Sequence, residues 1–179
     1  MTRTILKYGL ISGMIASLLM IASVPIMNRE GFDHGYILGY TGIVLSLLVT
    51  YFGVRSYREN VGKGQISFGK AFLVGLAITV ISCVFYVATW EVIYFKFMPD
   101  FLDKYGAHMI QKMQAAGATA AAIQAKSEEL HKLKVMYQNP LVNAAMTFIE
   151  PFPVGLVITL LSAAILRKKT PAQAAVAVS

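Results

Sequence analysis

The chain has 179 residues, of which 56% are hydrophobic and only 14% are charged, and its mean hydropathy is +0.61. Soluble domains are roughly 45–50% apolar and about 25% charged, so this composition excludes a disordered chain and argues against an ordinary soluble globule. Lys and Arg number 16 and Asp and Glu 9, giving a formal net charge of +7. The single cysteine, Cys83, excludes a disulfide framework and any motif of paired cysteines.

Long stretches without charged side chains predict four membrane-spanning helices. Residues 8–28, 35–54 and 71–90 carry no charge, and residues 135–166 carry only Glu150. About 20 apolar residues in a helix cross the hydrocarbon core of a bilayer. We therefore expect an all-α bundle within one integral membrane domain, residues 1–170, followed by a frayed tail at 171–179. The expected spans are 5–27, 35–54, 71–95 and 141–166, with the first retained rather than cleaved as a signal peptide.

Between the third and fourth spans, residues 100–137 are predicted to form a helical hairpin outside the membrane. Apolar side chains such as Phe101, Tyr105 and Met109 recur there at helical spacing. Gly117 interrupts the pattern, and a second amphipathic stretch follows. Three interpretations remain open: two helices that bury apolar faces on each other, a lid over a ligand site, or a surface for a partner.

The positions of the cations predict the orientation. Cytoplasmic segments next to membrane spans are enriched in Lys and Arg. Nine cations cluster on the side that would hold both termini: Arg3, Lys7, Arg55, Arg58, Lys63, Lys70, Arg167, Lys168 and Lys169. Both termini are therefore expected in the cytoplasm, and the basic balance is interpreted as a topology signal rather than as nucleic-acid binding.

Glycine pairs in the first two spans predict close helix packing. Gly9 and Gly13 form a G-x-x-x-G motif, and Gly35 and Gly39 form another. Such spacing lets helix backbones approach closely in lipid. We expect packing within the chain, with a homodimer as the alternative.

The candidate polar site consists of Glu150, Glu91, Asp33 and His34. Counted along their helices at 1.5 Å per residue, both glutamates lie in the outer part of the membrane. The short outer loop, residues 28–34, holds Asp33 and His34 at a similar level. Placing a charged glutamate near the membrane–water interface costs little free energy. The alternative is therefore that each glutamate has only a structural role. For Glu91, the expected interfacial partners are Lys96 and Arg29.

Glu150 carries the stronger hypothesis because Pro151 and Pro153 follow it. Proline has no N–H group, so the carbonyls of Thr147 and Ile149 lose their donors and the helix bends or breaks. Freed carbonyls beside a carboxylate resemble the broken-helix ion sites of transporters. Alternatively, Pro151 simply begins the last span.

No nucleophile–base pair, phosphate-binding loop or metal spacing occurs in the sequence. We therefore expect no enzyme activity, no cofactor and no metal. The lipid bilayer is the expected partner, and a homo-oligomer or a second membrane protein remains open.

Several short strings occur in a characteristic order along the chain. They include Gly64-Gln-Ile-Ser-Phe-Gly-Lys-Ala-Phe72, Tyr86-x-x-x-Trp90 and Glu150-Pro-Phe-Pro-Val-Gly155, and the order ends with Leu166-Arg-Lys168. In this order the chain resembles the bacterial membrane-protein family known as domain of unknown function 4199, over nearly its whole length. The resemblance implies four helices and a bacterial inner membrane, and it implies no catalytic residue. Two functions stay open: a non-enzymatic binding or accessory component, or a small oligomeric transporter or ion-coupled carrier that uses Glu150 and Glu91.

Overall fold

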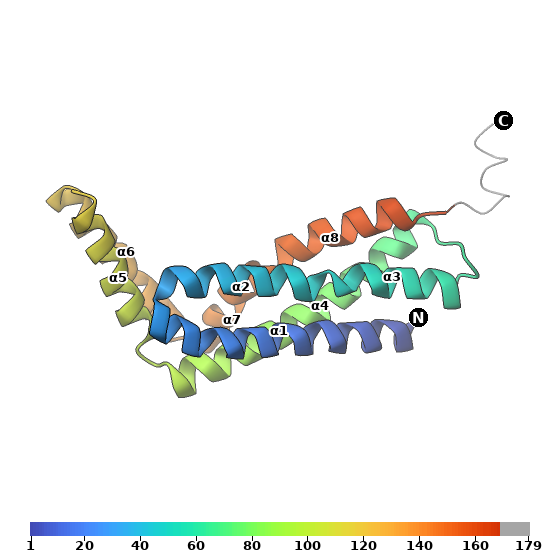
Figure 1. Cartoon of the computed structure of the whole chain (residues 1–179), viewed down its shortest axis with the longest axis horizontal. Coiled ribbons are helices and arrows are strands. Elements are labelled where there is room, and N and C mark those ends of the chain that lie inside the picture. The colour runs from blue at the N-terminus through green and yellow to red at the C-terminus, as the bar shows by residue number, and fades with distance from the viewer. Residues whose placement is uncertain (169–179) are drawn as a thin grey trace.

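The computed structural model describes residues 1–168, except the side chains of Asn28 and Glu30, and this part of the chain folds into helices without a strand (Figure 1). The predicted all-α fold is therefore confirmed. The predicted tail, residues 171–179, lies outside the described residues.

Four helical stretches are long and apolar enough to cross a membrane: Thr2–Met27, Phe32–Asn60, Phe68–Phe97 and Pro140–Leu166. They have 26 to 30 residues, so each spans about 40 Å, more than the roughly 30 Å of the hydrocarbon core. Each predicted span falls within one of these stretches. The element bounds are α1 Thr2–Glu30, α2 Phe32–Leu47, α3 Val49–Asn60, α4 Phe68–Val92, the π-helix Ile93–Phe97, α7 Pro140–Ile149 and α8 Pro151–Leu166.

The connection between α1 and α2 differs from the predicted seven-residue loop. The first helix continues to Glu30 and the second begins at Phe32, so Gly31 alone turns the chain. Gly31 has φ +91°, a conformation that side-chain-bearing residues rarely adopt and that glycine adopts freely. The loop prediction for residues 28–34 was therefore wrong, because one glycine suffices for the turn.

The central helix is α4, which contacts each of the other three stretches. Close packing against α1 uses the first glycine motif. A Cβ atom at Gly13 would lie 2.6 Å from Phe85, and one at Gly9 would lie 2.9 Å from Ile81. The motif in the first span therefore packs within the chain, as predicted.

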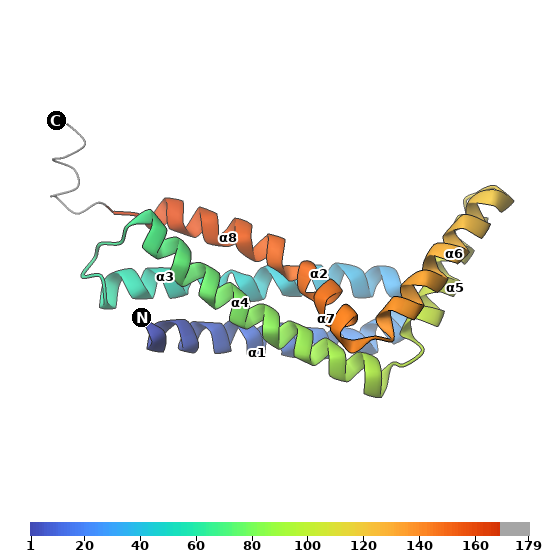
Figure 2. The same ribbon diagram turned by 180° about the vertical axis from the view of Figure 1, so that it is seen from behind.

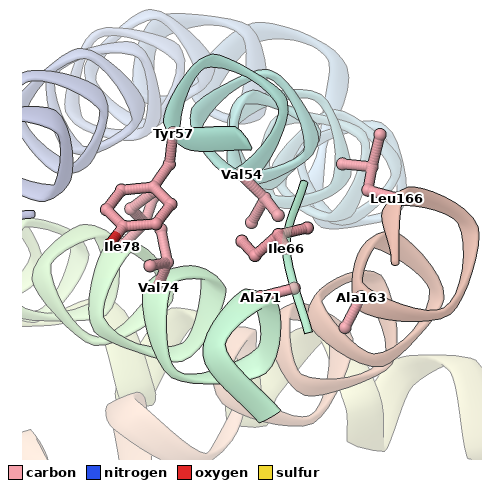
Figure 3. Packing of buried hydrophobic residues seen from close by; sticks show 8 residues of the cluster. All are labelled: Val54, Tyr57, Ile66, Ala71, Val74, Ile78, Ala163 and Leu166. Atoms are coloured by element: carbon pink, nitrogen blue, oxygen red, sulfur yellow. The ribbon is translucent and has the colours of Figure 1, made fainter. Parts of the chain in front are cut away.

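The main apolar core is shown in Figure 3. Ile5 and Tyr8 of α1 pack against it, so it lies at the end of the bundle that holds the N-terminus. Its buried side chains come from α3, α4, α8 and the loop before α4: Val54, Tyr57, Ile66, Ala71, Val74, Ile78, Ala163 and Leu166. The backbone N–H of Lys168 donates to the Ile66 carbonyl at 2.9 Å, which joins the end of α8 to this core. The N-terminus and the end of α8 thus lie at the same end of the bundle (Figure 1).

Hydroxyl groups hold the middle of the bundle together. The Ser12 hydroxyl lies 2.7 Å from the Ser46 carbonyl oxygen and 2.9 Å from the Ser82 hydroxyl. One turn earlier in α4, the Thr79 hydroxyl lies 3.1 Å from the Thr159 hydroxyl of α8. All five side chains are buried. Small hydroxyl residues of this kind allow close helix contact in lipid and supply hydrogen bonds between helices.

The helical hairpin consists of α5, Phe101–Ala115, and α6, Ala120–Tyr137. It projects from the end of the bundle opposite the N-terminus, at a steep angle to the membrane-spanning helices (Figure 2). Gly117, with φ +73°, turns the chain between the two helices. The predicted hairpin is therefore present, and its base lies directly on the bundle.

Candidate functional site: a cavity beneath the hairpin

A cavity of about 230 Å³ lies where the hairpin meets the bundle. Residues of α1, α2, α4 and α7 contribute to its wall, together with Glu150 at the junction of α7 and α8. Phe101, Leu102 and Tyr105 of α5 and Leu133 and Tyr137 of α6 complete it from the hairpin. The base of the hairpin therefore forms part of a cavity, in addition to the packing of α5 against α6.

Aromatic rings dominate the lining. Those with a polar atom come from four helices: Tyr36, Tyr40, Tyr86, Trp90, Tyr105 and Tyr137. Several rings contact one another, such as Tyr36 with Tyr40 at 5.4 Å between centroids and Trp90 with Phe101 at 5.0 Å. Distances of this size are those of favourable aromatic pairs. Phe32 of α2 also contacts Phe101 at 5.8 Å, so ring contacts link α2, the hairpin and α4, while Tyr36 and Tyr40 form a separate pair on α2.

Glu150 is the one carboxylate among the described residues that line the cavity, and no lysine, arginine or histidine is among them. The Tyr86 hydroxyl donates a hydrogen bond to Glu150 Oε2 at 3.1 Å. Within residues 1–168 no cation forms an ion pair with this carboxylate. The cavity therefore combines aromatic surface with a single acidic group.

The break in the fourth stretch brings Glu150 into the cavity. The helix α7 ends at Ile149 and α8 begins at Pro151, with Glu150 between them. The Glu150 N–H donates to the Thr147 carbonyl at 3.3 Å, so that carbonyl keeps a donor despite Pro151. Pro151 occupies the first turn of α8, where its missing N–H costs little. The break therefore provides the start of α8 and also places the Glu150 carboxylate at the cavity.

A buried amide that the sequence analysis missed supports this wall. Asn143 of α7 is fully buried. Its Oδ1 accepts hydrogen bonds from Trp90 Nε1 and from the Thr147 hydroxyl, both at 3.1 Å, and its Nδ2 donates to the Tyr137 carbonyl at 3.4 Å. Asn143 therefore ties α4, the end of α6 and α7 together. In the sequence, the signal available for this role of Asn143 was a single amide side chain within an apolar stretch.

Asp33 lies outside the cavity lining and anchors the hairpin. Lys112 of α5 donates to both carboxylate oxygens of Asp33 at 3.0 Å, and His108 Nε2 lies 3.6 Å from Oδ1. The neighbouring Phe32 ring contacts the rings of Tyr105 and His108 at 5.8 and 5.4 Å. These contacts fix α5 to the start of α2.

The other two predicted site residues also lie apart from the cavity lining. His34 is exposed on α2. Glu91 is half-buried near the end of α4, and its Oε1 is buried without a hydrogen-bond partner. The predicted ion pair with Lys96 or Arg29 is not found among the described residues. Of the four candidates, Glu150 alone lines the cavity.

Among residues 1–168, two ionisable groups outside the membrane-spanning stretches have shifted pKa values. Burial raises the pKa of the Tyr137 hydroxyl, and the charge of Glu150 adds to this rise. Tyr137 is therefore neutral at physiological pH and offers the cavity a ring and a hydroxyl. At the start of the hairpin, Lys104 donates to Asp100 at 2.8 Å and lowers the pKa of that exposed carboxyl.

Within residues 1–168, no group of three or more His, Cys, Asp or Glu side chains is arranged to hold a metal ion. A ligand in the cavity would meet one carboxylate, tyrosine and serine hydroxyls, and the faces of aromatic rings.

Four apolar helical stretches, joined by a hairpin that helps to enclose a cavity, define a small multi-pass membrane protein. Comparison with protein families identifies it further. Residues 7–168 match the family described as protein of unknown function, DUF4199, and the chain belongs to this family, as its motifs predicted. Searches of curated proteins and of solved structures found no match.

Proposed function

We propose that the protein is a non-enzymatic binding component of a bacterial inner membrane, and that its ligand occupies the cavity beneath the hairpin. The observation that carries this proposal is the composition of the cavity lining. Binding pockets are concave, mostly apolar and aromatic, and contain a few polar groups that orient the ligand. Glu150 and the tyrosine hydroxyls match that description. A single carboxylate among rings suits binding better than covalent catalysis.

The proposed orientation places the hairpin and the cavity on the outer side. Its support is the cluster of eight cations among the described residues at the opposite end of the bundle, from Arg3 and Lys7 to Arg167 and Lys168. In this orientation both termini are cytoplasmic and a ligand enters from the outer face or from the outer leaflet. The lipid bilayer is the first proposed partner. The exposed helix faces are also compatible with a second copy of the chain or with another membrane protein. Nucleic acid is not a proposed partner.

A small oligomeric carrier is the second candidate function. The feature that favours it is the interruption of the fourth stretch at Glu150, beside the cavity. Interrupted helices hold ions and substrates in many transporters. Glu91 does not line this cavity, so a carrier of this kind would use Glu150 without it.

Filling the cavity tests the binding proposal. Gly39 lines the cavity, and a Cβ atom there would meet nothing within 4 Å. Gly69 has equally open space but lies at the start of α4, outside the cavity. Gly39→Phe and Gly69→Phe are therefore a matched pair.

Native mass spectrometry of the detergent-purified protein provides the readout. We expect a small molecule or lipid to remain bound to the wild type and to Gly69→Phe, and to be lost from Gly39→Phe. The same bound species on all three proteins would contradict the proposal.

A further inference from the structure

We propose that the ligand of this cavity is a small organic cation with a substituted ammonium group. The inference rests on the proposed binding function and adds the chemical class of the ligand. It follows from three properties of the lining: its charge, its aromatic faces and its size.

The charge of the lining is unbalanced. Glu150 is its one acidic group among the described residues, and no basic side chain lines the cavity with it. Tyr86 donates one hydrogen bond to Oε2, which is a neutral partner. Glu150 is exposed and lines the cavity, so its carboxylate is accessible to a ligand. A charged group within a membrane-spanning stretch is costly unless it is paired. A cationic ligand supplies the positive charge that the described residues around the cavity do not.

The aromatic faces favour the same ligand class. The negative face of a tyrosine or tryptophan ring attracts an ammonium group, and cages of such rings recognise quaternary ammonium ligands. Tyr36 is 54% exposed and Tyr40 is 45% exposed, so the packing of the described residues leaves part of each ring uncovered. Both line the cavity on the side of α2, together with Tyr86 and Trp90 of α4. Their surfaces are thus available to a ligand.

The cavity volume limits the ligand to a small one. About 230 Å³ lies below the roughly 300–1,000 Å³ of pockets for drug-sized ligands. A trimethylammonium group with a short chain is of suitable size. Such a group has two sources, a free organic cation or the headgroup of a phosphatidylcholine, and the chemistry recognised is the same for both.

The chain contains its own reporter of binding. Trp90 is its single tryptophan and lines the cavity, so a change in tryptophan fluorescence reports this site. We would titrate the full chain in dodecyl maltoside with choline and with its uncharged isostere, 3,3-dimethylbutan-1-ol. Cation–π attraction together with the carboxylate predicts that choline binds at least about tenfold more tightly than the isostere.

Two sets of variants assign that preference to named side chains. Glu150→Gln should abolish most of the preference, whereas Glu91→Gln, which changes a glutamate outside the cavity, should retain it. In a second set, Tyr40→Leu should weaken choline binding severalfold and Tyr40→Phe, which keeps the ring, should not. Tyr40 is exposed enough for both substitutions to leave the fold intact, which keeps the test valid if Glu150→Gln fails to fold.

The outcomes separate the two proposals. Equal affinity for choline and its isostere, or an unchanged preference in Glu150→Gln, would overturn the ligand class while leaving a binding cavity in place. A wild-type fluorescence that responds to the isostere but not to choline would do the same. If neither compound binds, the ligand class is overturned, and the cavity-filling pair decides whether the binding function stands.

Membranes of defined composition then distinguish the two sources. In nanodiscs of phosphatidylglycerol, choline should bind as in detergent. If phosphatidylcholine nanodiscs suppress this binding, the lipid headgroup occupies the site. If the two kinds of nanodisc give equal choline binding, the ligand is a free cation. Absence of choline binding in both would overturn the proposal.

Discussion

Replacement of Asn143 by alanine should destabilise the protein and disturb the cavity wall. The amide is fully buried and takes part in hydrogen bonds with Trp90, Thr147 and the Tyr137 carbonyl. Two of these bonds join α7 to other elements and the bond with Thr147 lies within α7. At about 0.6 kcal/mol for each side-chain hydrogen bond in a membrane protein, the loss of all three predicts about 2 kcal/mol. The Trp90 indole would also lose the acceptor of its N–H group.

The assay is reversible unfolding in detergent, combined with tryptophan emission. Asn143→Ala should lower the free energy of unfolding by about 2 kcal/mol and shift the emission of Trp90. A double-mutant cycle with Trp90→Phe, followed by circular dichroism, should give a coupling of about 0.6 to 1.7 kcal/mol. The exposed Asn60, whose amide donates only to Ser56, provides the control variant Asn60→Ala. Coupling near zero, or equal losses in both asparagine variants, would refute the reasoning.

Three further predictions concern packing, the hairpin and topology. Gly13→Leu should prevent α1 from packing on α4 and lower the melting temperature, whereas Gly39→Leu, which enters open space, should not; equal losses would contradict this. Asp33→Asn should make the hairpin more susceptible to limited proteolysis, most clearly at low salt because the ion pair between Asp33 and Lys112 is exposed; an unchanged cleavage rate would show that ring contacts alone hold it. A reporter active only outside the cytoplasm should be active after Ala118 and silent after Gly62, and the reverse would overturn the orientation.

The four membrane-spanning stretches were predictable because lipid imposes a strong constraint. Backbone groups in the hydrocarbon core must pair within a helix, so charge-free stretches such as residues 8–28 translate directly into helices. The turn at Gly31 was not predictable in the same way. The charged residues on both sides of Gly31 are typical of a loop. The backbone shows instead that Gly31 alone, with its positive φ, turns the chain.

The candidate site was predictable only in part. Sequence position gives the depth of Glu150 and Glu91, but not the neighbours that each carboxylate meets. The structure places Glu150 against Tyr86 in the cavity and leaves Glu91 outside its lining. Tyr36, Tyr86 and Tyr137 come from helices that are far apart in sequence, so their convergence depends on packing. Asn143 was missed because a lone amide carries no spacing pattern.

The central claim is that the cavity beneath the hairpin binds a small organic cation, and equilibrium dialysis with labelled choline tests it most directly. For the wild type and for Gly69→Phe in dodecyl maltoside, we predict one saturable site per chain. Gly39→Phe, which fills the cavity, should bind no choline while keeping the wild-type helical content. Saturable binding that survives in Gly39→Phe, or the absence of saturable binding to the wild type, would contradict the account.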